Sequence, residues 1–330
     1  MINAVNPDRV LENIITLDQV SKNFVDGSKF FKKQRVTRAV NKVTLTIKQG
    51  EVLGLVGESG CGKSTLGRVI LRLHDPTSGC IGFLNQDITH MKENQLRSIR
   101  RDFQMIFQDP YASLNPRFTV REILSKPYKV HGMSYTVETI KENMELVGLN
   151  PSYINRYPHE FSGGQRQRIG IGRAIALNPK FVVCDEPVSA LDVSVQAQIL
   201  NLLTDLKEKL KMTYLFISHD LSVVHHISDR IAVMYLGNIV EIQERDQFFN
   251  HPLHPYSQAL LSSIPLANPF LQRNRERVIL KGELPSPINP PQGCPFHPRC
   301  PIAQDCCKEA EPELRQMATG QYVACHFPLK

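Results

Sequence analysis

Apolar residues recur with two different periods along the chain, and the alternation between these periods predicts an α/β fold. Apolar runs typical of buried strands occur at Val52–Val56, Phe181–Cys184 and Tyr214–Ile217. Apolar residues at helical spacing follow two of these runs, at 66–73 and at 195–210. The pattern therefore predicts a buried sheet whose strands alternate with helices.

The pattern changes character twice, which predicts three kinds of region. Residues 13–56 contain short β-rich pieces. From about 111 to 178 the strand signals fade, and helical pieces predict a helical insertion. After about residue 245 prolines become frequent and periodicity weakens. We therefore expect a main domain and a C-terminal extension, spanning 1–245 and 246–330.

Two helices are predicted within the insertion, at 136–147 and 165–177. The second carries Gly170 and Gly172, each of which costs a helix about 1 kcal/mol relative to alanine. Close packing against a neighbouring helix is the physical reason that we expect for these glycines.

The chain has 330 residues and a net charge of +7. No apolar run approaches the ~18–20 residues that span a bilayer, and the N-terminus lacks the charged and apolar regions of a signal peptide. We therefore expect a cytoplasmic chain. A basic run with two phenylalanines, Lys29–Arg35, is compatible with nucleic acid or a membrane surface. A solvated loop is the interpretation that we favour, so we expect no nucleic-acid partner.

The stretch with the most specific chemistry lies between the first apolar run and the helix at 66–73. It reads Gly57-Glu58-Ser59-Gly60-Cys61-Gly62-Lys63-Ser64-Thr65 and fills every fixed position of the phosphate-loop pattern G-x-x-x-x-G-K-[ST]. Glycines let the backbone close around a polyphosphate, which then meets successive N–H groups and the positive end of the helix. Lys63 is expected to reach the β- and γ-phosphates, and Ser64 to ligate Mg²⁺. The alternative is a plain glycine-rich turn.

Two carboxylates, Asp185 and Glu186, follow the apolar run Phe181–Cys184, where open α/β sheets place their ligands. Asp185 is expected to hold Mg²⁺, and Glu186 to accept a proton from the attacking water. A second helix start rich in backbone donors, Ser162-Gly163-Gly164-Gln165, can also bind an anion, although a glycine cap is the plainer interpretation. Two such sites predict a phosphate held from both sides across a dimer.

The chain resembles the nucleotide-binding subunits of ATP-binding cassette (ABC) transporters over residues 13–245. The resemblance rests on these motifs and their order, together with Gln108, Ser189-Ala190-Leu191-Asp192 and His219. The resemblance implies an α/β phosphate-loop ATPase core with an antiparallel β subdomain and a helical insertion. It also implies two subunits that meet head to tail with ATP between them. Ser162–Gln165 of one subunit would face the phosphate loop of the other, and Asp192 would lie at the interface.

The resemblance implies roles for further residues. Gln108 would contact Mg²⁺ and the attacking water and would sense the membrane subunits. Glu186 would be the general base, and His219 would contact the γ-phosphate. An aromatic residue near the N-terminus stacks on adenine in this family; the candidate is Phe24, with Phe30 and Phe31 as alternatives.

A narrower resemblance covers nearly the whole chain. The stretches 107–116 and 185–194 and the tail from His251 to His326 look like the second of two ATPase subunits in dipeptide and oligopeptide importers. The partners implied are a related second ATPase subunit, two permease subunits and an extracytoplasmic peptide-binding protein, with this chain at the cytoplasmic face of the inner membrane. Close relatives of these systems carry nickel or glutathione, so these substrates stay open.

Five of the eight cysteines crowd into the C-terminal extension, which in a cytosolic chain favours metal or a cofactor over disulfides. The short C-x2-4-C pairs of structural zinc sites are missing. A [4Fe–4S] cluster, zinc and free thiols all stay open on spacing alone. Members of the resembled family carry a [4Fe–4S] cluster here, with a structural role, which implies the ligands Cys294, Cys300, Cys307 and Cys325. The adjacent Cys306 competes for the third position, and the family spacing favours Cys307.

Two other functions use some of the same motifs. Non-transport ATPases of this superfamily act in DNA repair, chromosome organisation or translation. The ATPases of DNA repair and chromosome organisation insert coiled coils or zinc modules, whereas residues 110–180 of this chain lack heptads. The ATPases of translation carry two cassettes in one chain, and this chain has one. In a metal or redox module, ATP would be only regulatory. The ATPase that powers a peptide importer accounts for most of the motifs.

Overall fold

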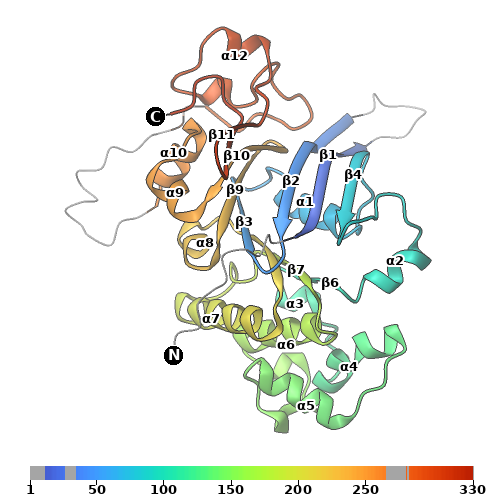
Figure 1. The fold of residues 1–330 in the computed structure, drawn as a ribbon. Helices are drawn as coiled ribbons and strands as arrows, with labels where there is room; N and C mark the ends of the chain where they lie inside the picture. Colours follow the sequence, from blue (N-terminus) through green and yellow to red (C-terminus); the bar gives the residue numbers. More distant parts are fainter. Residues whose placement is uncertain (1–11, 27–34, 265–279, 281, 330) are drawn as a thin grey trace, which may run out of the picture.

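The computed structural model describes residues 12–26, 35–264, 280 and 282–329, in two sheets and a set of helices (Figure 1). The larger sheet has eight strands in the order β11-β12-β10-β9-β3-β8-β7-β6. The five strands from β9 to β6 run parallel, and the other three are antiparallel. Their bounds are β3 (Val52–Val56), β6 (Phe103–Ile106), β7 (Phe181–Asp185), β8 (Thr213–Ile217), β9 (Arg230–Tyr235), β10 (Asn238–Glu244), β11 (Arg315–Ala318) and β12 (Gln321–Val323).

The three predicted buried strands, β3, β7 and β8, are confirmed, and every residue in them is buried. Alternate residues of β8 belong to opposite halves of the core. Tyr214 and Phe216 pack with the helical side, whereas Leu215 and Ile217 pack with the smaller sheet and the helix after β3. Burial on both faces explains why these strands read as continuous apolar runs.

The helices that lie along the larger sheet include α1 (Lys63–Ile70), α7 (Val193–Leu210) and α8 (Leu221–Ile227). The predicted insertion holds four helices and two 3₁₀ turns: α3 (Pro110–Ser113), α4 (Val120–His131), α5 (Val137–Leu146), α6 (Gly163–Ile175), η1 (Pro151–Tyr153) and η2 (Pro158–Glu160). Together with α7 they gather at one end of the molecule (Figure 1). The predictions at 136–147 and 165–177 correspond to α5 and α6 and are confirmed.

The two glycines of α6 differ in their surroundings. A Cβ on Gly172 would lie 2.9 Å from Asn143 Oδ1 and 3.2 Å from a methyl carbon of Leu124, whereas a Cβ on Gly170 would meet nothing within 4 Å. The expected close packing is therefore confirmed at Gly172 and is wrong at Gly170.

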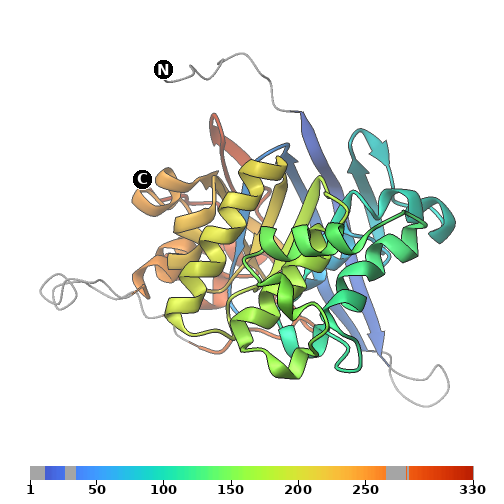
Figure 2. The same ribbon diagram turned by 90° about the horizontal axis from the view of Figure 1, so that it is seen from below.

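The smaller sheet is antiparallel, in the order β2-β1-β4-β5, and confirms the antiparallel β subdomain. Its strands are β1 (Asn13–Asp26), β2 (Arg35–Lys48), β4 (Ser78–Phe83) and β5 (Gln86–Asp87). Helix α2 (Glu93–Ile99) follows β5. In both views α2 lies on the opposite side of the molecule from α9 (Arg245–Asn250) and α10 (Pro255–Ser262) (Figures 1 and 2).

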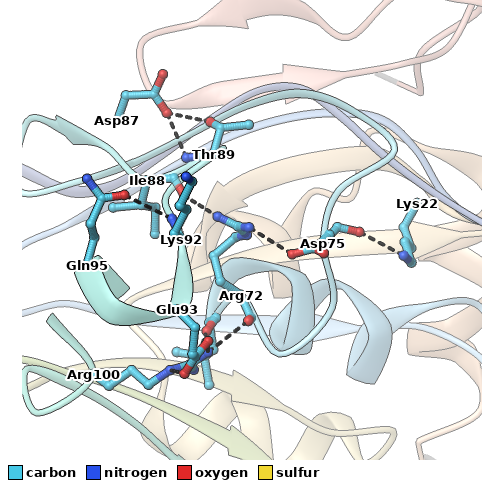
Figure 3. Close-up of polar contacts among 11 residues, drawn as sticks. Lys22, Arg72, Asp75, Asp87, Ile88, Thr89, Lys92, Glu93, Gln95 and Arg100 are labelled. Atoms are coloured by element: carbon cyan, nitrogen blue, oxygen red, sulfur yellow. Dashed lines mark hydrogen bonds and ion pairs between the residues drawn. The ribbon is translucent and has the colours of Figure 1, made fainter. Parts of the chain in front are cut away.

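A polar network joins the smaller sheet to the end of α1 (Figure 3). The buried Arg72, just after α1, donates to Asp75 Oδ1 at 2.8 Å, and Lys22 Nζ of β1 donates to the carbonyl oxygen of Asp75 at 2.7 Å. Arg100, beside α2, holds both carboxylate oxygens of Glu93 at 2.9 Å. The network therefore fixes β1 against the helix that begins at the phosphate loop.

The C-terminal extension continues the larger sheet. Strand β12 pairs with β10, through Glu241–Val323 and Ile242–Tyr322, and β11 pairs with β12. The helical pieces of the extension are α9 (Arg245–Asn250), α10 (Pro255–Ser262), η3 (His297–Arg299) and α12 (Cys306–Glu309). Within the described ranges, none of the helices combines the length and the apolar character that a bilayer crossing requires.

Candidate functional site

The predicted phosphate loop connects β3 to α1, with glycines at its two tightest points. Gly57 has φ +152° and Gly62 has φ +109°. A Cβ would lie 2.2 Å from the carbonyl oxygen of Met234 at Gly57, and 2.1 Å from that of Ala39 at Gly62. Only glycine fits at both positions, so these residues set the shape of the loop.

Lys63 begins α1, and its side chain folds back over the loop. Its Nζ donates to the carbonyl oxygens of Gly57 at 2.8 Å and Glu58 at 3.0 Å, and only 4% of the residue is exposed. The ammonium group therefore lies inside the curve of the loop, where it can meet a phosphate.

Ser64 and Asp185 form a pair of oxygen ligands beside the loop. Ser64 Oγ donates to Asp185 Oδ1 at 2.6 Å, and Arg68 lies 3.8 Å from Asp185 Oδ2. Burial raises the pKa of the Asp185 carboxyl, while the bond from Ser64 and the charge of Arg68 oppose that rise. Hydroxyl and carboxylate oxygens suit Mg²⁺, so these residues fit the predicted ion.

Three predicted catalytic residues meet at one oxygen atom. Gln108 Nε2 donates to Glu186 Oε2 at 2.9 Å, and His219 Nδ1 lies 3.2 Å from the same oxygen. Glu186 directly follows β7, Gln108 follows β6, and His219 follows β8. The parallel sheet thus brings together residues that are far apart in the sequence.

A cavity of about 630 Å³ joins these groups. The predicted residues that line it are Phe24, Ser59, Gly60, Cys61, Gly62, Lys63, Ser64, Thr65, Gln108, Glu186 and His219. Phe24 is 38% exposed and packs edge-on against His74 at 5.6 Å. The alternatives Phe30 and Phe31 lie outside the described residues. Thr37, Arg38 and Pro287 also line the cavity, and no sequence motif indicated them.

Ser162 and Asp192 stand apart from that lining, both exposed at helix starts. Ser162 Oγ accepts from the Gln165 N–H at 3.3 Å, and Gln165 Oε1 accepts from the Ser162 N–H at 3.0 Å, at the start of α6. Asp192 Oδ1 accepts from the Val195 N–H at 2.9 Å, at the start of α7. Both residues therefore act as helix caps within the chain.

The C-terminal extension contacts the phosphate loop at Glu58. The Glu58 N–H donates to the Tyr256 hydroxyl at 2.8 Å, and Arg299 donates to both Glu58 carboxylate oxygens, at 2.7 and 3.0 Å. Sequence reasoning missed both contacts because the partners lie 198 and 241 positions away and belong to no shared motif.

The cysteines of the extension differ in exposure. Cys294 and Cys307 are buried, Cys300 and Cys325 are half-buried, and Cys306 is exposed. Burial is the main cause that raises the pKa of Cys294 to about 11, and the other three ligand candidates act in the same direction. Within the described part of the chain, no three His, Cys, Asp or Glu side chains converge on a point where one metal ion could bind.

Comparisons with known proteins cover both parts of the chain. Residues 40–189 match the family described as "ABC transporter", and residues 240–307 match "Oligopeptide/dipeptide transporter, C-terminal region". The oligopeptide transport ATP-binding protein AppF of Bacillus subtilis (strain 168) is 54% identical over 322 residues, 96% of this chain and 98% of its own. The oligopeptide transport ATP-binding protein OppF of Escherichia coli (strain K12) is 50% identical over 319 residues, 95% of each chain.

A solved structure also resembles this fold. It is an ATP-binding cassette in a dimeric, post-hydrolysis state bound to ADP and Pi. Its TM-score is 0.63 at 30% identity, and the match covers 70% of this chain and 98% of that one.

Proposed function

The chain belongs to the ATP-binding proteins of ABC transporters, and we propose that it hydrolyses ATP to power import of oligopeptides or dipeptides. The observation that carries the proposal is the extent of the likeness. It covers the ATPase motifs and also the C-terminal region, whose family is described as an oligopeptide/dipeptide transporter. Both regions therefore support the same cargo class.

Each group of the site has a step to perform. Lys63 leaves the loop carbonyls, 2.8 and 3.0 Å away, to bind the phosphates, while the loop N–H groups hold them. Phe24 supplies an apolar face for adenine. Ser64, Asp185 and Gln108 would hold Mg²⁺, which neutralises charge on the phosphates.

Glu186 is the proposed general base. It follows a buried strand, and its carboxylate faces the cavity beside Gln108 and His219. In this arrangement Glu186 Oε2 accepts a proton from the attacking water, Gln108 orients that water, and His219 donates to the γ-phosphate. The water oxygen bonds to the γ-phosphorus, the bond from that phosphorus to the β–γ bridging oxygen breaks, and ADP and phosphate are the products.

The second half of each site comes from a partner subunit in this proposal. The segment Ser162–Gln165 starts α6 at the surface, and its capping box uses the N–H groups of Ser162 and Gln165 but not those of Gly163 and Gly164, which suits a phosphate held from the other side. The exposed Asp192 would lie at the same interface. The partner is a second, homologous ATPase subunit, so two ATP molecules would lie between the pair.

A groove beside Gln108 is the proposed contact for the permease subunits. It has a volume of about 720 Å³ and lies between the strands of the core and helix α4, with Phe107, Pro127 and Val130 among its lining residues. A permease segment seated there would touch Gln108 directly, which links transport to the catalytic oxygen of Glu186. Two permeases and an extracytoplasmic peptide-binding protein complete the proposed importer, with this chain peripheral on the cytoplasmic face of the inner membrane.

The cysteines are proposed to hold a [4Fe–4S] cluster with a structural role, through Cys294, Cys300, Cys307 and Cys325. Burial raises the pKa of Cys294, Cys300 and Cys325, and neighbouring cysteine thiols act in the same direction; a bound cationic metal group would favour the thiolate forms. Zinc is the alternative, and it needs four ligands about 2.3 Å from one point. Cysteines on a cluster ligate separate irons and so need not converge in that way.

Metal analysis of anaerobically purified protein tests this assignment, with Cys300→Ser and Cys306→Ser as a matched pair. We expect about four irons per chain in the wild type, loss of iron in Cys300→Ser and retention in Cys306→Ser. Stoichiometric zinc, or metal-free protein with full stability, would contradict the cluster.

Transport is tested by reconstituting the chain with the permeases, second ATPase and binding protein encoded beside it. We expect peptide uptake that requires ATP and stops in the Glu186→Gln variant. Uptake of nickel or glutathione instead of peptides would refute the proposed cargo and keep the ATPase role. ATP hydrolysis at a rate that the permeases and peptide leave unchanged, with no uptake of any cargo, would favour a non-transport ATPase.

A further inference from the structure

We propose that Arg299 is a positioning residue for ATP binding: it fixes and neutralises the Glu58 carboxylate of the phosphate loop. The proposal goes beyond the assigned ATPase motifs because Arg299 lies in the C-terminal extension, 241 residues from its partner. It rests on the proposed function only in requiring that this loop binds ATP.

Three groups of Glu58 are held, two of them by the extension. Its N–H donates to Tyr256 at 2.8 Å, and its carboxylate accepts both bonds from Arg299. Its carbonyl oxygen accepts from Lys63 at 3.0 Å and from the Cys61 N–H at 3.3 Å. When Lys63 moves to a phosphate, its bond to Glu58 is lost, and the bonds from the extension to Glu58 remain. The extension therefore keeps the phosphate loop in its shape when Lys63 moves from the loop carbonyl oxygens to a phosphate.

Charge gives Arg299 a second effect. Glu58 places a carboxylate on a loop built to bind a polyanion, and the ion pair with Arg299 offsets the repulsion between this carboxylate and the phosphates. The Arg299 side chain is 9% exposed and that of Glu58 29%, so solvent screens this pair weakly. The bidentate geometry suits a guanidinium and cannot be reproduced by lysine.

The segment that carries Arg299 is packed on the same loop support. Arg299 ends η3, and Phe296 just before η3 packs against Tyr235 and Tyr256, with ring centroids 5.3 and 5.4 Å apart. Tyr256 is fully buried and lies in the first turn of α10. Arg299 and Tyr256 thus contact Glu58 from segments that pack together in one aromatic cluster, so both contacts hold the phosphate loop from the same side.

The test measures ATP affinity of the purified full-length chain by equilibrium dialysis, and KM and kcat for hydrolysis in the presence of its partner ATPase. We expect Arg299→Ala to raise the Kd and KM for ATP about tenfold, with kcat changed much less, because an uncompensated charge and a lost bidentate bond act on binding. Arg299→Lys should recover part of the affinity. The double variant Glu58→Gln/Arg299→Ala should bind ATP more tightly than Arg299→Ala alone, since the unpaired charge is gone.

The control is Arg245→Ala, which removes a half-buried arginine at the start of α9, beside the extension, whose side chain forms an ion pair with Asp246 and does not contact the phosphate loop. We expect its Kd for ATP to equal that of the wild type. Thermal unfolding of every variant separates affinity from folding. Unchanged Kd in Arg299→Ala, or no recovery in the double variant, would overturn the proposal. A wild-type chain that fails to bind ATP would instead refute the proposed function.

Discussion

Replacing His254 with asparagine should remove a large part of the chain's sensitivity to acid. His254 caps α10: its ring Nδ1 accepts the Tyr256 N–H at 3.0 Å, so the ring must be unprotonated there. The residue is 1% exposed, and its ring packs on Phe296 at 5.5 Å. Burial lowers the pKa of His254 from 6.5 to about 3. The folded protein therefore needs a neutral ring that the unfolded chain readily protonates.

The sign and size of the effect follow from this difference. Because the folded pKa lies below the unfolded one, the unfolded state binds more protons between pH 6.5 and about 3. Stability is full above pH 6.5 and falls as the pH drops. The loss attributable to His254 is about 2 kcal/mol at pH 5 and up to about 5 kcal/mol near pH 3.

Urea unfolding followed by circular dichroism, at pH values from 8 to 4, measures the effect. Asparagine can cap the helix by accepting the same Tyr256 N–H. The His254→Asn variant should therefore be less stable than the wild type by a constant amount, from the lost ring packing, and its stability should fall less steeply below pH 6.5. Parallel stability curves for wild type and variant would refute the assignment of a neutral buried His254.

Three further predictions concern other parts of the chain. Glu186→Gln should lower ATP hydrolysis at least about 10²-fold while ATP still binds, because only the proton acceptor is lost; equal loss of binding and hydrolysis would contradict its role as base. Gly172→Ala should destabilise the fold by about 1–3 kcal/mol, whereas Gly170→Ala should stabilise it by up to about 1 kcal/mol, both measured by chemical unfolding; equal effects would contradict the packing difference. Glu51→Gln should cost about 3–5 kcal/mol because it leaves the buried Arg230 without its ion-pair partner, 3.0 Å away; a loss below about 1 kcal/mol would show that Arg230 finds another acceptor.

The parts of the fold that the sequence predicted are those governed by local signals. The buried strands, helices α5 to α7 and the glycines of the phosphate loop all follow from spacing and sterics within a few residues. The meeting of Gln108, Glu186 and His219 could be expected because parallel strands end at one edge. Helix α4 gave no clear signal, since Pro127 lies inside it.

Contacts between distant segments could not be predicted in this way. Arg299 is one of many arginines in a proline-rich tail, and nothing near it in the sequence indicates Glu58. At Gly170 the sequence instead predicted a contact that the structure lacks. A glycine in a helix suggested close packing, but the space next to Gly170 is open. Likewise, the pairing of β12 with β10 depends on two short segments about 80 residues apart.

That pairing limits how the protein can be divided. A chain cut after residue 245 would expose the β10 backbone as an open strand edge, which invites association with other chains. The same cut would remove Tyr256 and Arg299 from the phosphate loop. Hybrid transporters assembled by exchanging ATPase cores should therefore carry each core together with its own tail.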